Sequence, residues 1–268
     1  MIQLNDVSVQ FKNVTALQPT SLTFQQGQFV VLLGASGAGK STLLRCLNLL
    51  REPDTGSIEL AGLGALCNRK VLQQHRRQTG MIFQQHQLIR RHSALQNVLM
   101  GRLGYHSTLR TLFPLSGQEQ AIALHSLERV GLLHKALSRV DQLSGGQQQR
   151  VGIARALAQQ PHLILADEPV ASLDPATADK ILALLHRICK EDGISAVVSL
   201  HQVELAKRYA DRIIGLAHGR VVFDGAPAAL TPTHITELYE PKTLATGKPS
   251  ERSTRVPFFS LNLANVED

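Results

Sequence analysis

Hydrophobic residues follow two different patterns in the first part of the chain. Up to residue 24 they alternate with polar residues, at Ile2, Leu4, Val7, Val9, Leu22 and Phe24. Such alternation, followed by a turn signal at Gln26-Gly27, predicts antiparallel strands with one buried face. Residues 29–33, FVVLL, form a continuous apolar run instead, which is typical of a strand covered on both faces in a parallel sheet.

Later apolar runs extend this α/β pattern. Residues 163–166 and 196–200 predict two more buried strands, and residues 212–216 and 221–223 predict a hairpin around His218-Gly219. From about residue 85 to 160 the period is helical, and one helix face would carry Leu124, Leu127, Val130 and Leu133. The sequence therefore predicts an α/β core with a mostly helical insertion.

The composition changes at Pro241. From there to residue 268 the chain is rich in Lys, Thr, Ser, Pro and Arg, which is typical of a mobile tail. Its last apolar group (Phe258, Phe259, Leu261 and Leu263) leaves a docked tail as the alternative. We expect one domain at residues 1–240 and a flexible segment at 241–268.

Charge and cysteine usage narrow the function classes. The net charge of +7 favours anionic partners such as nucleotides, nucleic acid or the inner face of a membrane, but no basic block marks a nucleic-acid tail. The three cysteines (Cys46, Cys67 and Cys189) form no CxxC motif, so a disulfide framework or zinc knuckle is not indicated and a reducing cytosol fits. Without a signal-peptide pattern or an 18-residue apolar run, any membrane role must come through a partner.

The segment after the first buried strand matches GxxxxGK[ST]. It reads Gly34, Ala35, Ser36, Gly37, Ala38, Gly39, Lys40, Ser41 and Thr42, and leads into a predicted helix with Leu43, Leu44, Leu47 and Leu50. Glycines let successive N–H groups turn onto phosphates at a positive helix end. We expect Lys40 to reach the β- and γ-phosphates and Ser41 to ligate magnesium. A flexible turn with a solvated lysine is the alternative, but strand, loop and helix agree on a nucleotide site.

Two carboxylates follow the apolar run 163–166. Asp167 and Glu168 stand at a strand terminus, where an open parallel sheet presents ligand-binding groups. Asp167 is placed to hold magnesium, through water, and Glu168 to polarise the attacking water. An ordinary Asp-Glu-Pro turn is the alternative, which the phosphate-loop motif makes less attractive.

A second anion site is predicted at residues 143–150, LSGGQQQR. Ser144, Gly145, Gly146 and Gln147 open an apolar helix, so a hydroxyl and free N–H groups meet at its positive end. Here the chain resembles the ABC ATPase family, in which two subunits pair head to tail and each signature segment closes over the partner's ATP. The resemblance covers residues 1 to about 240. It implies a P-loop NTPase core with a mixed sheet, an N-terminal antiparallel β subdomain and a helical subdomain at about 85–160.

The resemblance also assigns roles. Gln84 corresponds to the glutamine that senses magnesium, Asp174 to the loop that crosses the dimer interface, and His201 to the histidine that contacts the γ-phosphate. Phe11 occupies the position of an aromatic residue that stacks on adenine. Catalysis would depend on Glu168, His201 and Lys40, with Mg²⁺ held by Ser41, Gln84 and Asp167.

The implied partners follow from the same family. They are a second copy of the chain, two integral membrane permease subunits and, through the permease, a periplasmic solute-binding protein. The chain would lie peripherally at the cytoplasmic face of the inner membrane. A soluble ABC ATPase acting on nucleic acid is the rival class, but the chain has no long coiled coil, zinc knuckle or second cassette.

Segments that are less widely shared among ABC ATPases indicate the transported solute. Residues 97–104, 107–113, 166–175 and 199–206 look like those of phosphonate importer ATPases. An exporter, or an importer of another small anion such as phosphite or phosphate, remains the alternative. We expect residues 101–114 to help contact the membrane subunit, with a long surface loop of no special role as the alternative. Tyr105 stands where relatives usually have a basic residue.

Overall fold

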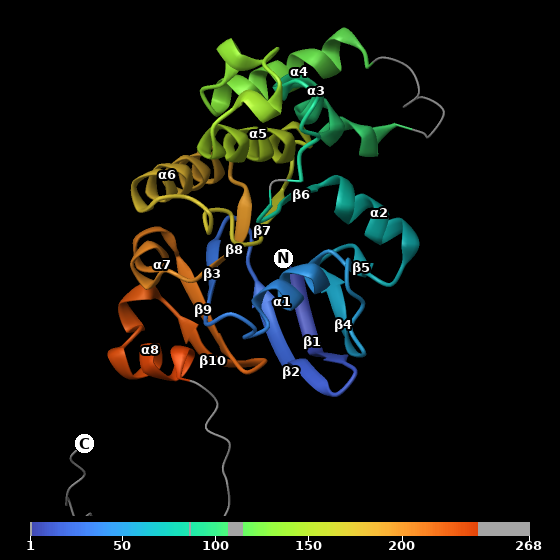
Figure 1. The fold of residues 1–268 in the computed structure, drawn as a ribbon. Helices are drawn as coiled ribbons and strands as arrows, with labels where there is room; N and C mark the ends of the chain where they lie inside the picture. The colour runs from blue at the N-terminus through green and yellow to red at the C-terminus, as the bar shows by residue number, and fades with distance from the viewer. Residues whose placement is uncertain (1, 86, 107–114, 241–268) are drawn as a thin grey trace, which may run out of the picture.

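The computed structural model describes residues 2–85, 87–106 and 115–240, in which two sheets are covered by helices (Figure 1). The first sheet has the order β2-β1-β4-β5 and is antiparallel. Its strands are β1 (Ile2–Phe11), β2 (Val14–Phe24), β4 (Thr55–Leu60) and β5 (Gly64–Ala65). The alternating N-terminal pattern therefore does form an antiparallel β unit.

The second sheet has the order β10-β9-β3-β8-β7-β6. Its strands are β3 (Phe29–Leu33), β6 (Thr79–Ile82), β7 (Leu163–Ala166), β8 (Ser195–Leu200), β9 (Arg212–Ala217) and β10 (Arg220–Gly225). Neighbouring strands from β9 to β6 are parallel, and β10 adds an antiparallel edge. The predicted mixed sheet and the predicted hairpin are both confirmed.

The helices gather in groups around these sheets. The elements are α1 (Lys40–Leu47), α2 (Arg69–Arg77), α3 (Ala94–Leu99), η1 (Met100–Tyr105), α4 (Gly117–Arg129), η3 (Leu133–Lys135), η4 (Val140–Gln142), α5 (Gly145–Ala158), α6 (Pro175–Glu191), α7 (Val203–Tyr209), η5 (Pro227–Ala229) and α8 (Pro232–Tyr239). In Figure 1, α3, α4 and α5 lie together at the top, whereas α1 lies beside the strands below. None of the helices in the described ranges is long and apolar enough to cross a membrane.

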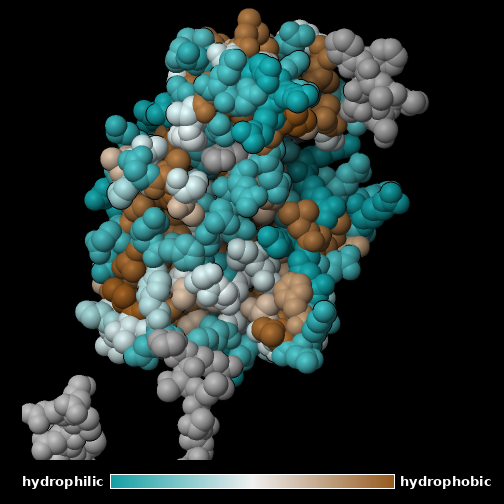
Figure 2. Space-filling view, viewed as in Figure 1, coloured by the Kyte–Doolittle hydropathy of each residue, from teal (hydrophilic) through white to brown (hydrophobic). Residues whose placement is uncertain are grey.

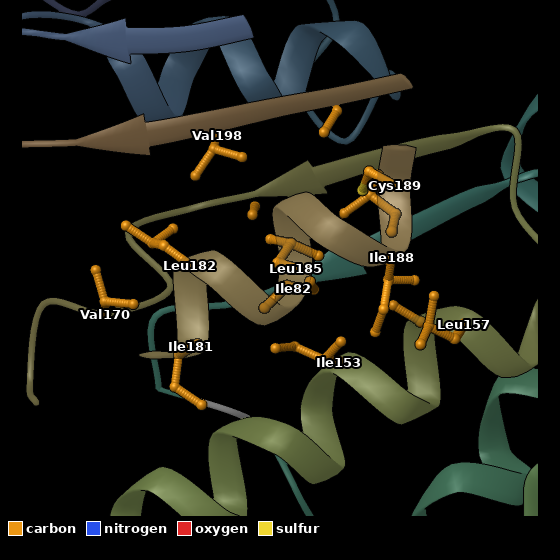
Figure 3. Packing of buried hydrophobic residues seen from close by; sticks show 14 of the residues in the cluster. Ile82, Ile153, Leu157, Val170, Ile181, Leu182, Leu185, Ile188, Cys189 and Val198 are labelled. Carbon is orange, nitrogen blue, oxygen red and sulfur yellow. The ribbon is translucent and has the colours of Figure 1, made fainter. Parts of the chain in front are cut away.

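Both faces of the parallel sheet are buried, as its apolar runs predict. In β3, Val31 and Leu33 belong to one core with α5 and α6, while Val30 and Leu32 belong to a second core with α1 and the antiparallel sheet. Figure 3 shows α6 between the strands and α5, with side chains from both helices meeting. On the face in Figure 2, hydrophilic residues dominate and hydrophobic ones form separate small patches.

Two residues that the sequence predicted to lie in helices, Leu50 and Leu133, lie beyond the ends of those helices. Helix α1 ends at Leu47, and Leu50 lies beyond it with 52% of its surface exposed. Helix α4 ends at Arg129, so Leu133 falls in η3 and is 44% exposed. We still propose a domain of residues 1–240 with a helical subdomain at about 85–160. The expected tail, 241–268, lies outside the described residues.

Candidate functional site

The loop between β3 and α1 is clamped on two sides. A Cβ on Gly34 (φ +152°) would lie 2.1 Å from the carbonyl oxygen of Leu216, and one on Gly39 (φ +105°) would lie 2.5 Å from that of Ala16. The N–H of Gly219 donates to the carbonyl oxygen of Ala38 at 3.0 Å. Only glycine tolerates these approaches, so glycines at 34 and 39 follow from the packing of β9 and β2 against the loop.

Lys40 places a cation at the centre of this loop. The residue is only 3% exposed, and its Nζ donates to the carbonyl oxygens of Gly34 at 2.8 Å and Ala35 at 2.9 Å. Burial lowers the pKa of Lys40, while the carboxylates of Glu168 and Asp167 act to raise it. The acidic pair therefore favours the charged form that a phosphate would need.

The acidic pair is held by hydroxyl groups from two neighbouring elements. Ser41 Oγ donates to Asp167 Oδ1 at 2.7 Å, and Ser199 Oγ donates to the same oxygen at 3.0 Å. Ser199 Oγ also accepts the N–H of Glu168 at 2.8 Å. Glu168 has a left-handed backbone (φ +47°), a conformation that is costly outside glycine and recurs at functional sites.

The Glu168 carboxylate meets three further side chains. Its Oε1 lies 2.5 Å from His201 Nε2 and 3.8 Å from Lys40 Nζ, and its Oε2 accepts from Gln84 Nε2 at 3.2 Å. His201 Nδ1 lies 3.1 Å from the carbonyl oxygen of Gly34 and 3.3 Å from Lys40 Nζ. An imidazole, a carboxylate and a buried cation therefore lie together at this place.

The side chains that meet around Glu168 follow the ends of four strands of the parallel sheet. Gln84 follows β6, Asp167 and Glu168 follow β7, His201 follows β8, and Lys40 and Ser41 follow the loop after β3. The carboxyl ends of parallel strands meet at one edge of a sheet, which is where such folds bind ligands. Sequence reasoning missed Ser199, because a serine inside an apolar strand gives no signal of what its hydroxyl contacts.

The oxygen atoms near Lys40 fit a magnesium ion. Ser41 Oγ and Asp167 Oδ1 are a hydroxyl and a carboxylate, the donor types that Mg²⁺ prefers. Within the part of the chain that the structure describes, no group of three or more His, Cys, Asp or Glu residues is placed to hold a metal. A magnesium ion here would complete its shell with water and phosphate oxygens, as it usually does at nucleotide sites.

The second predicted anion site lies elsewhere in the chain. Ser144 is exposed and caps α5: its Oγ accepts the N–H of Gln147 at 3.3 Å, and Gln147 Oε1 accepts the N–H of Ser144 at 3.0 Å. A Cβ on Gly146 would lie 2.9 Å from Thr177 Cγ2, and one on Gly145 would lie 3.6 Å from Leu173. This helix end belongs to the upper group in Figure 1, apart from α1.

Two other expected positions have ordinary local partners. Asp174 caps α6 by accepting the N–H of Thr177 at 3.0 Å, and this hydrogen bond lowers its pKa. Phe11 is 47% exposed at the end of β1, and the guanidinium of Arg51 lies 4.9 Å from its ring centre. These contacts explain the two residues locally, and their assigned roles stay predictions.

A glycine loop, a lysine and an acidic pair at the edge of a parallel sheet define a nucleotide-hydrolysing protein of the P-loop class. Comparison with known proteins identifies a narrower class within these. The model of the ABC transporter family matches residues 17–171. The dimeric structure of a bacterial ABC transporter cassette has a TM-score of 0.74 at 37% identity, over 85% of this chain and 99% of that one.

Curated relatives match over most of the chain. Phosphonates import ATP-binding protein PhnC 3 of Nostoc sp. is 62% identical over 240 residues, or 89% of this chain and 92% of the relative. Phosphite import ATP-binding protein PxtA of Stutzerimonas stutzeri is 65% identical over 226 residues, or 84% and 82%. The chain therefore belongs to the ABC transporter family, as one of its ATP-binding and ATP-hydrolysing subunits.

Proposed function

We propose that this chain is the ATPase subunit of an ABC importer that couples ATP hydrolysis to phosphonate uptake across the inner membrane. The observation that carries the proposal is the 62% identity to a phosphonate import ATP-binding protein over 89% of the chain. Phosphite is the second candidate solute, because a phosphite import ATP-binding protein is 65% identical. The site described above would bind nucleotide and not the transported solute, so its residues do not distinguish phosphonate from phosphite.

Hydrolysis follows from the contacts of Lys40, Glu168 and His201. The loop and Lys40 would hold the β- and γ-phosphates, with Lys40 leaving its carbonyl partners for phosphate oxygens. Glu168 positions and polarises the attacking water, and His201, already within 2.5 Å of that carboxylate, stabilises the proton and charge that develop. Ser41, Gln84 and Asp167 would hold a bound Mg²⁺, whose charge would neutralise that of the phosphates.

The active form is a dimer of this chain. Ser144 and Gly145 are exposed at the end of α5, a helix that lies apart from α1, so they are free to meet the nucleotide of a second copy. A Ser hydroxyl and N–H groups at a helix N-terminus suit a γ-phosphate. ATP would bind the closed pair more tightly than the open one and so shift the population toward it.

Two integral membrane permease subunits would bind the dimer, and the periplasmic solute-binding protein would act through them. A cleft of about 920 Å³ between α2 and η1 supports a docking role for the first part of the run 101–114. Arg69, Lys70 and Tyr105 are among its lining residues. Residues 107–114 lie outside the described residues. The chain would thus work at the cytoplasmic face of the inner membrane, with no nucleic-acid partner.

The reconstituted importer tests the assigned cargo. Permease and binding protein from the same operon would be assembled with this chain in proteoliposomes, and ATP hydrolysis measured with an alkylphosphonate, phosphite, phosphate or sulfate. We expect the alkylphosphonate to stimulate hydrolysis most. A complex with Glu168→Gln gives the background. Stimulation by phosphite alone would move the assignment to the second candidate, and stimulation by none of the four would refute both.

Exchanging residues 101–114 for the corresponding run of an importer for another solute, with the buried Arg102 kept in place, tests the docking role. We expect the exchanged chain to keep its basal ATPase activity and to lose stimulation by the permease. Unimpaired coupling to the original permease would show that this run is an ordinary surface loop.

A further inference from the structure

Helix α8 is fixed tightly against the edge of the parallel sheet. Leu238 is 1% exposed and packs so closely on Gly215 of β9 that a Cβ there would lie 2.8 Å from Leu238 Cδ2. The ring of His234 lies 4.9 Å from that of Phe223 in β10. In Figure 1, α8 lies beside β10 and below α7. The helix therefore has a defined position relative to the end of β8.

Tyr239, the last residue of α8, uses this position to reach the nucleotide site. Its hydroxyl donates to the backbone carbonyl oxygen of His201 at 2.6 Å, across 38 residues of sequence. Tyr239 is half-buried, and burial raises its pKa, so the phenol stays protonated at neutral pH. A carbonyl oxygen only accepts, so the hydrogen bond runs one way.

The backbone around His201 has weak local support. It lies between the end of β8 at Leu200 and the start of α7 at Val203, and Gln202 caps α7 without a side-chain hydrogen bond. The imidazole must nevertheless meet two fixed atoms at once, the carbonyl oxygen of Gly34 and Glu168 Oε1. A shift of the His201 peptide would lengthen both contacts, because the ring follows its backbone.

We propose that Tyr239 is a positioning residue for ATP hydrolysis, whose hydroxyl holds the His201 backbone so that the imidazole stays aligned between Gly34 and Glu168. In this role Tyr239 acts through the backbone of His201 and not on the nucleotide itself. The inference rests on the proposed catalytic role of His201. It makes helix α8 part of the hydrolytic machinery, whereas its packing alone would assign it only the covering of the sheet edge.

The variant Tyr239→Phe removes the hydroxyl and keeps the ring. We expect kcat to fall about 5- to 10-fold, the effect of one neutral hydrogen bond. KM for ATP should stay within about 2-fold, because Lys40 and the loop are untouched. Tyr209→Phe is the matched control: Tyr209 Oη lies 2.9 Å from Asp179 Oδ1 on α6, so the same group is lost away from His201. We expect its kcat to remain unchanged.

A double-variant cycle separates positioning from general destabilisation. In single-turnover assays on a His201→Ala background, Tyr239→Phe should cause no further loss, because its target is gone. Equal losses in both backgrounds, or no loss in the unaltered chain, would overturn the proposal. If His201→Ala itself left hydrolysis intact, the catalytic role of His201 would fail, and that result is distinguishable from failure of Tyr239 alone.

Histidine-labelled NMR supplies a readout that does not depend on turnover. The ring resonances of His201 should shift in Tyr239→Phe and remain in place in Tyr209→Phe. Unshifted His201 resonances in Tyr239→Phe would contradict a positioning role even if kcat fell.

Discussion

Arg102 is the buried cation that ties η1 to its neighbours, and its removal should cost much of the stability of the chain. The residue is 6% exposed, and its Nε forms a short ion pair with the carboxylate of Glu119 in α4. Nη1 donates to the carbonyl oxygen of Ala158 at 2.8 Å and to Gln160 Oε1 at 3.2 Å. The guanidinium also lies 4.2 Å from the ring centre of Tyr105.

Replacing Arg102 by Met leaves the Glu119 carboxylate buried with His106, at 3.0 Å, as its one remaining side-chain partner among the residues that the structure describes. Burial raises the pKa of Glu119, yet the hydrogen bond and charge of Arg102 hold it below its ordinary value, so the carboxylate is ionised at neutral pH. Removing one partner of a buried pair costs about 3–5 kcal/mol. At about 2–4 °C per kcal/mol for a chain of this size, Arg102→Met should lower Tm by roughly 6–20 °C.

Thermal unfolding at pH 7.5, followed by circular dichroism, measures this effect. Adding Glu119→Gln to Arg102→Met should raise Tm, because it removes the unpaired charge, whereas Glu119→Gln alone should lower Tm. Arg139→Met is the control, since the side chains of Arg139 and Asp141 are 50% and 26% exposed and such pairs contribute less than about 1 kcal/mol. Additive losses in the double variant would refute this reasoning.

Two further predictions concern buried titratable groups. Burial is the main cause that lowers the pKa of His75. As the pH falls below about 6.5, the unfolded chain therefore binds a proton that the folded chain does not. The free energy of unfolding should then fall by up to about 1.4 kcal/mol per pH unit. His75→Gln should weaken this pH dependence of Tm, whereas His125→Gln should not, because that side chain is 67% exposed. Equal slopes of Tm against pH in the unaltered chain and both variants would contradict the assignment of this effect to His75. Burial raises the pKa of Cys46 to about 11 and that of Cys189 to about 12, so brief iodoacetamide treatment at pH 8, read by mass spectrometry, should label exposed Cys67 and spare both until urea is added. Labelling of either buried thiol as fast as Cys67 would count against the packing described.

The sequence predicts those parts of the fold in which a local pattern of residues is compatible with a single structure. A run such as residues 29–33 has to be covered on both faces, and the glycines at 34 and 39 leave room for backbone that approaches within van der Waals distance. Short or weakly apolar elements escape this reasoning. Strand β6 has four residues, TGMI, and its place comes from pairing with β7.

The residues of the nucleotide site were predictable only where they belong to a recognisable sequence motif. Lys40, Asp167 and Glu168 lie in contiguous segments with recognisable chemistry, and the structure brings them together with His201 and Gln84. Contacts between distant segments have no such signal. The hydroxyls of Ser199 and Tyr239 depend on strand order and on the docking of α8, which local sequence does not encode.

ATP-dependent self-association of the Glu168→Gln variant tests the central claim most directly. The variant keeps Lys40, the loop and Ser144 but loses the carboxylate that polarises water, so bound ATP should persist. We expect its mass by light scattering to rise with MgATP from 29.3 kDa to twice that value, and to return to that of the monomer when Ser144→Arg is added. A variant that binds labelled ATP tightly and still remains a monomer would contradict a nucleotide site completed by a second copy of the chain.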